Sequence, residues 1–179
     1  MQTNNAARYV VPFVHASCLL AAKHDPRALA STLEAQQPGL TVMLLENVFA
    51  PQLTAAIACP RAEVKCIVVG CVRLLCEGDE LAARPPAWAK VLQGVLALLE
   101  PAAAAADDGD AGAEEEQIGY DAAYSQLRFA QADAHDALAV VPDARLFAAQ
   151  TLKAHAAKLA PLLQQLPPEQ SAALQALLA

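Results

Sequence analysis

The stretch RAEVKCIVVGCVRLLC, residues 61–76, decides the fold class of this chain. It contains the nearest approach to a β-strand in the sequence, residues 66–69, but that run lies within a longer helical pattern and is flanked by charges. Gly70 costs a helix about 1 kcal/mol relative to alanine, so we expect another helix to pack closely against it. The apolar residues recur at the spacing that places them on one face of a helix: Ile67, Cys71, Leu74 and Leu75.

Further helices are predicted on both sides of this one, because prolines interrupt the apolar stretches. Asp25 is expected to cap a helix that has Pro26 in its first position. Pro12 fits near the start of the first helix, Pro51 should kink or end the third, and Pro161 should break the one that begins at 143. The predicted ranges are 8–23, 26–36, 40–53, 61–76, 85–100, 143–159 and 168–179.

The composition narrows the function classes. Of 179 residues, 56% are hydrophobic and only 4% aromatic, and the net charge is −7. An acidic chain is a poor candidate for binding nucleic acid, because such proteins concentrate basic residues. No apolar run reaches the roughly 18 residues of a membrane span, so we expect no membrane insertion. The five cysteines lack C-x-x-C spacing, which favours reduced thiols, with Cys18, Cys66 and Cys71 buried in helices.

No arrangement of residues indicates catalysis. The four histidines never recur at a three- or four-residue spacing, so a metal site within one helix is not expected. There is no glycine-rich phosphate loop and no G-x-S-x-G motif. Asp133, His135 and Asp136 are interpreted as a loop cluster making local hydrogen bonds. We therefore predict a protein that is not an enzyme and carries no metal and no cofactor.

Residues 102–117 form the strongest electrostatic feature and are predicted to be an acidic, flexible loop. Such a run can simply keep the surface solvated. Its functional interpretation is an arm that attracts a basic partner and increases the association rate in a salt-dependent way. The candidate partner-binding residues are Asp107, Asp108, Asp110, Glu114, Glu115 and Glu116.

The fold class predicted from these elements is all-α, with antiparallel helix pairs stacked in one region, residues 1–179. Two of the expected helix starts, at Pro38 and Pro86, lie about 48 residues apart, close to the spacing of HEAT or armadillo units. Two other interpretations stay open. One is a compact helical bundle that binds a small molecule in an apolar pocket, and the other is a structural scaffold.

Residues 118–130, IGYDAAYSQLRFA, are followed by His135 and Asp136, and this segment resembles the C-terminal part of the importin-α re-exporters, the CAS exportins of the importin-β superfamily. Residues 42–53 and 63–77 are similar to two helices of the same family, and Trp88 also has a counterpart there. Tyr120, Tyr124 and Leu127 additionally fall on one face of a short amphipathic helix.

The resemblance implies a nuclear transport receptor built from HEAT repeats. Such a receptor binds importin-α together with GTP-bound Ran in the nucleus and carries importin-α to the cytoplasm, so both compartments are implied as its location. The 179 residues would correspond to the last few repeats, and we do not expect them to sustain transport alone. Without preceding repeats, an exposed apolar flank is expected around Val10, Val11 and Val14.

Overall fold

The structure, a computed structural model, describes residues 5–56, 59, 61–100 and 136–178. Within these ranges every regular element is a helix, which confirms the predicted all-α, HEAT-like fold class. In chain order the elements are α1 (Asn5–Lys23), α2 (Pro26–Gln36), α3 (Leu40–Leu44), the π-helix η1 (Leu45–Phe49), α4 (Ala50–Ala55), α5 (Arg61–Glu77), α6 (Asp79–Ala82), α7 (Pro85–Leu98), α9 (Ala144–Ala154), α10 (Ala156–Leu163) and α11 (Pro168–Leu178).

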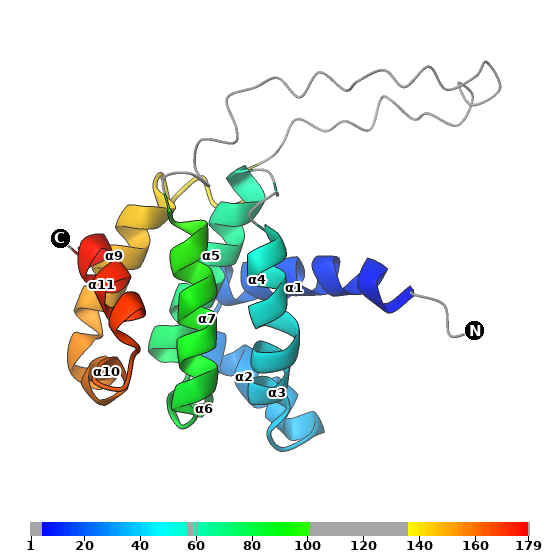
Figure 1. Ribbon diagram of the computed structural model, residues 1–179. Coiled ribbons are helices and arrows are strands. Elements are labelled where there is room, and N and C mark those ends of the chain that lie inside the picture. Colours follow the sequence, from blue (N-terminus) through cyan, green and yellow to red (C-terminus); the bar gives the residue numbers. More distant parts are fainter. Residues whose placement is uncertain (1–4, 57–58, 60, 101–135, 179) are drawn as a thin grey trace, which may run out of the picture.

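The helices are packed side by side with reversals between them (Figure 1). The rod formed by α3, η1 and α4 runs in one direction, α5 returns, and α7 reverses again after the short α6. Helix α5 is the central element, because α1, α2, α7 and α9 all contact it. Helix α1 runs across the direction of the other helices. Helix α11 packs against α7 and α9 at the side of the molecule that carries the C-terminus.

One continuous apolar core connects these helices, and α5 and α7 supply most of its centre. Trp88 is fully buried, and its indole Nε1–H donates to the carbonyl of Leu75 at 3.0 Å. That carbonyl belongs to the last turn of α5, where backbone oxygens have no partner within the helix. Trp88 of α7 therefore supplies a hydrogen-bond donor to the C-terminal turn of α5 and also fills the core.

The close packing expected at Gly70 is confirmed. A Cβ atom added to Gly70 would lie 2.3 Å from the backbone oxygen of Cys18, so only glycine lets α1 approach α5 this closely. The Sγ atoms of Cys18 and Cys71 lie 3.8 Å apart at this contact, and both side chains are fully buried free thiols. Cys66, in contrast with the prediction, is only partly buried.

Arg73 connects the end of α1 to α5. Its Nη1 donates to the carbonyls of Ala21, Ala22 and His24 at 2.8–3.0 Å, and its Nε donates to Glu77 at 2.9 Å. The carbonyls at a helix C-terminus carry partial negative charge and need donors. The guanidinium therefore caps α1 while it is held in place by a carboxylate one turn away.

Asp25 caps α2 as predicted, because its side chain accepts a hydrogen bond from the backbone N–H of Arg27 at 2.9 Å. The prediction for Pro12 is wrong: α1 begins at Asn5, so Pro12 lies inside the helix. Proline removes one hydrogen bond from a helix interior. The helix continues nonetheless because packing of its inner face on α5, rather than local propensity, supplies most of its stability.

Pro51 neither ends nor sharply breaks the helical run that contains it, since α4 continues to Ala55. The chain instead widens into η1 just before the proline, and the N–H of Ala50 donates to the carbonyl of Leu45, five residues back. An α-helix turns once in 3.6 residues, so positions four apart drift around it. The wider turn offsets that drift and keeps one stripe facing the core: Thr41, Leu45, Phe49 and Leu53.

Residues 40–53 are apolar on nearly all sides, which favours a helix enclosed by neighbours, but the side chain of Met43 is exposed. The predicted helix 143–159 is also two helices, which meet at His155, and Pro161 lies inside the second. The ring of Pro161 crowds the carbonyl of the residue four positions earlier, Ala157. The break in helical geometry, at His155, lies two residues before Ala157. The predicted helix 118–130 lies outside the described residues.

The first testable prediction concerns Gly70. Replacing it with alanine favours the isolated helix by about 1 kcal/mol but forces α1 and α5 apart, which costs up to about 3 kcal/mol. We therefore expect Gly70→Ala to lower the free energy of unfolding, measured by urea titration with Trp88 fluorescence. An increase in stability would show that the two helices are not in close contact.

The second prediction concerns the cap on α1. Arg73→Met keeps most of the aliphatic stem but removes the hydrogen bonds of the charged group, so we expect the free energy of unfolding to fall by about 2–3 kcal/mol. Arg61→Met is the matched control, because Arg61 is exposed on the same helix. Equal stabilities of the two variants would contradict the capping role.

Candidate interaction surfaces

The acidic residues predicted to bind a partner, Asp107 to Glu116, lie outside the described residues, as do Asp133 and His135. Their role stays a prediction. Asp136 is described, and its Oδ1 accepts the backbone N–H of Leu138 at 2.9 Å while Oδ2 pairs with Lys65 at 2.6 Å. Asp136 therefore makes one local hydrogen bond, as its sequence indicated, and one ion pair with a residue distant in the sequence.

The exposed apolar flank predicted around Val10, Val11 and Val14 is confirmed only at Val11. Val14 is buried in the core and Val10 is partly buried against it. The exposed apolar face of α1 is formed by Tyr9, at 69%, Leu20, at 45%, and Phe13, whereas Val11 is exposed on another side of the helix. Helical periodicity decides which residues of α1 are buried, because Val14, Cys18 and Ala21 all lie on the side that faces the core.

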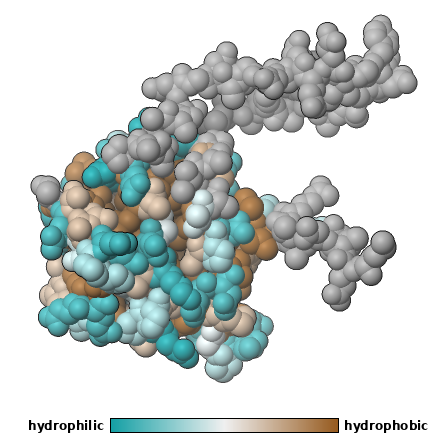
Figure 2. Space-filling view, in the orientation of Figure 1, coloured by the Kyte–Doolittle hydropathy of each residue, from teal (hydrophilic) through white to brown (hydrophobic). Residues whose placement is uncertain are grey.

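Phe13 packs this face of α1 against η1, the helix that contains Phe49. Its ring meets the ring of Phe49 edge to face, with centroids 6.3 Å apart and planes at 85°. Figure 2 shows apolar residues at the right-hand edge of the body, where α1 lies in Figure 1. Solenoids bury such faces on the next helix pair in line.

Small cavities open on the described surface, and two of them are formed entirely by described residues. One, of about 160 Å³, lies among α7, α9 and α11 and includes Leu96, Arg145 and Leu177. The other, of about 50 Å³, lies among α1, α4 and the start of α5. Sites for drug-sized ligands occupy roughly 300–1,000 Å³. Neither cavity therefore favours the interpretation of a helical bundle that binds a small molecule.

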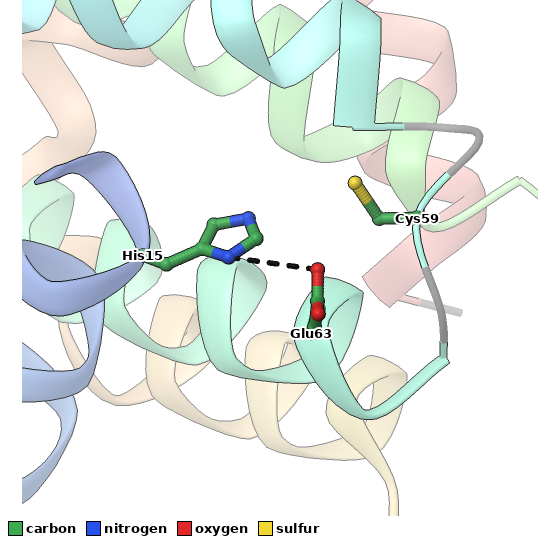
Figure 3. A group of neighbouring side chains, drawn as sticks. All are labelled: His15, Cys59 and Glu63. Carbon is green, nitrogen blue, oxygen red and sulfur yellow. Dashed lines mark ion pairs between the residues drawn. The ribbon is translucent and has the colours of Figure 1, made fainter. Parts of the chain in front are cut away.

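Three side chains with metal-ligand chemistry gather beside the smaller cavity (Figure 3). His15 comes from α1, Cys59 precedes α5, and Glu63 lies in the first turn of α5. The His15 Nδ1 and Glu63 Oε2 atoms lie 3.5 Å apart, and one donor atom from each of the three residues lies within 4.8 Å of the others. Burial, followed by the Glu63 carboxylate, raises the pKa of the Cys59 thiol.

The sequence did not predict this cluster, because its ligands do not recur along one helix. Cys59 and Glu63 are four residues apart, which was an available signal, but a proline separates them and only one of them lies in a helix. His15 is 44 positions before Cys59, so only the packing of α1 on α5 brings it close. Among the described residues, this is the one group of three such side chains that could hold an ion.

None of the described helices combines the length and hydropathy needed to span a membrane. The fold and these surfaces define the chain as a helical-repeat protein with faces suited to contacting other proteins.

Comparison with known proteins specifies the family. The family model "CAS/CSE protein, C-terminus" matches residues 1–177, and the chain therefore belongs to this family of nuclear transport receptors. It is 32% identical over 172 residues to Exportin-2 of Drosophila melanogaster, in a match that covers 86% of this chain and 17% of that protein. The chain thus spans about one sixth of the length of this relative. No solved structure matches the chain.

This result confirms the resemblance drawn from residues 42–53, 63–77 and 118–130. It also agrees with the absence of a catalytic motif from the sequence, because exportins are a family of transport receptors rather than of enzymes. The described helices are in keeping with the helical-repeat character of such receptors.

The exposed face of α1 gives the third prediction. We expect the 179-residue chain to self-associate at high concentration, and the double variant Tyr9→Ser, Leu20→Gln to reduce this, because it removes the most exposed apolar surface of α1. Sedimentation velocity over a concentration series measures the effect. Leu146→Gln is the control, since the exposure of Leu146, 54%, lies between those of Tyr9 and Leu20, but Leu146 is on α9. A monomeric parent chain would contradict the prediction.

Proposed function

We propose that this chain acts as the C-terminal part of an exportin that binds importin-α together with GTP-bound Ran and returns importin-α from the nucleus to the cytoplasm. The observation that carries the proposal is the family match, which runs over residues 1–177. The similarity to Exportin-2 supports it. A protein with this role moves between nucleus and cytoplasm. The net charge of −7 does not favour nucleic acid as a partner.

In this proposal the chain contributes one end of a larger partner-binding superhelix. Its match covers only 17% of Exportin-2, so most of the surface of such a receptor comes from other repeats. The exposed residues of α1 are the part of the chain that contacts the preceding repeat, because stacked repeats bury apolar faces on their neighbours. The chain by itself therefore lacks most of the surface that a ternary complex needs.

The acidic residues Asp107, Asp108, Asp110, Glu114, Glu115 and Glu116 are proposed to attract a basic surface of a partner. Charges of this kind raise the rate of association more than they raise affinity, and salt screens them. Their effect should therefore be sought in association kinetics at low ionic strength.

A chimaera tests the proposal and gives the fourth prediction. The matched C-terminal region of Drosophila Exportin-2 is replaced by this chain, and binding of importin-α and GTP-loaded Ran is measured with purified proteins. We expect the chimaera to form the ternary complex, and the 179-residue chain alone to form none at the same concentrations. GDP-loaded Ran is the negative control.

A folded chimaera that binds neither partner would overturn the proposal and leave a structural scaffold as the function. A robust ternary complex on the 179 residues alone would contradict the division of the binding surface. Neutralising the six acidic residues in the chimaera should slow association in low salt, whereas neutralising Glu100 and Glu169 should not, because these exposed charges lie outside the acidic run.

A further inference from the structure

We propose that His15, Cys59 and Glu63 form a binding site for a zinc-type divalent cation, which fastens α1 to the beginning of α5. This site is separate from the proposed partner-binding role, and it stands on the geometry of the described residues.

The packing of the two long helices brings the ligands together. His15 lies three residues before Cys18 on α1, and Glu63 lies seven residues before Gly70 on α5, so both face the side on which Cys18 and Gly70 make their closest approach. The tight contact between the backbones therefore brings these two side chains together, with His15 Nδ1 3.5 Å from Glu63 Oε2. Figure 3 shows Cys59 directing its sulfur toward the same space.

The third ligand is held by its own backbone. The N–H of Cys59 donates to the carbonyl of Ala56 at 3.0 Å, and Ala56 is buried in the core. Apolar side chains line the adjoining cavity on the inner side, including Val14, Leu53 and Ile67. Glu63 is 47% exposed on the outer side, so an ion can enter from solvent.

The ligand types select the metal class. A thiolate, an imidazole and a carboxylate are the groups that hold Zn²⁺, at distances of about 2.0–2.3 Å. Three such ligands leave one position of a tetrahedral ion for water. The thiolate and the carboxylate supply two negative charges, which match a divalent cation. Magnesium and calcium require oxygen ligands and are not expected to bind.

Ion binding requires the thiol to lose its proton. Partial burial, and after it the nearby Glu63 carboxylate, raises the pKa of the free Cys59 thiol and keeps it protonated. The incoming cation bonds to sulfur, and the released proton goes to solvent. A bare ion pair between His15 and Glu63 would make no use of Cys59, so participation of the sulfur distinguishes a metal site from an ion pair.

Cobalt serves as the probe and gives the fifth prediction. The full 179-residue chain, freed of any tag, is titrated with Co²⁺ in a chelator-treated, reducing buffer. We expect one Co²⁺ to bind per chain, with a thiolate-to-cobalt charge-transfer band and intense tetrahedral d–d bands, and Zn²⁺ to displace it. Zn²⁺ should also raise Tm, because it binds the folded chain.

Three ligand variants are each paired with a control of the same residue type. Cys59→Ser should abolish the charge-transfer band, while Cys66→Ser should retain it. His15→Ala and Glu63→Gln should weaken binding by about tenfold or more, while His24→Ala and Glu80→Gln should not. Fluorescence of the buried Trp88 verifies that each variant is folded. Glu63→Gln keeps the test decisive if the other two perturb folding, because Glu63 is exposed.

Retention of the charge-transfer band in Cys59→Ser would overturn the proposal, since another cysteine would then be the ligand. Absence of any cobalt band at about 1 mM metal, a concentration that detects even weak affinity, would overturn it as well. Either outcome leaves the transport proposal untouched, because the chimaera experiment does not depend on metal.

Discussion

The contact between α1 and α5 at Gly70 is the constraint on which the rest of the structure depends. A missing side chain at this position allows the Cys18 backbone to come within the space that a Cβ atom would fill. Once the two helices lie that close, Arg73 reaches the carbonyls at the end of α1, and His15 is brought to Glu63. Packing, capping and the candidate metal site therefore share one geometric cause.

Helix α5 also positions other helices, because it packs against several of them. It contacts α1 and α2 on one side and α7 and α9 on the other, so a single apolar core runs through the described part of the chain. Two of its terminal carbonyls receive donors from other helices, Leu75 from Trp88 and Glu77 from Arg27. In repeat proteins each added helix pair contributes stability through its interface with the pair before it. This property suits a chain of the CAS/CSE family, whose match covers one part of a longer receptor.

The prolines show where local rules were sufficient and where they were not. Pro26 and the pair at 85–86 begin helices as expected, because a first helical position needs no N–H. Pro12, Pro51 and Pro161 lie inside helical runs, where a local rule predicts a break. Burial of the apolar stripe outweighs one lost hydrogen bond, and at Pro51 a widened turn keeps that stripe in register. These compensations depend on neighbours that no local window contains.

The sequence by itself determined the all-α class, most of the helices and the family, because helical periodicity, proline position and the similar segments are local properties of the chain. It also identified Gly70 as a point of close packing, since a glycine inside a helix is costly without a neighbour. Only the tertiary structure decided which face of α1 is exposed, what Arg73 caps, and that His15 meets Cys59 and Glu63. Those outcomes depend on the rotation and separation of helices that are distant in sequence, and that geometry is fixed only when the whole core packs.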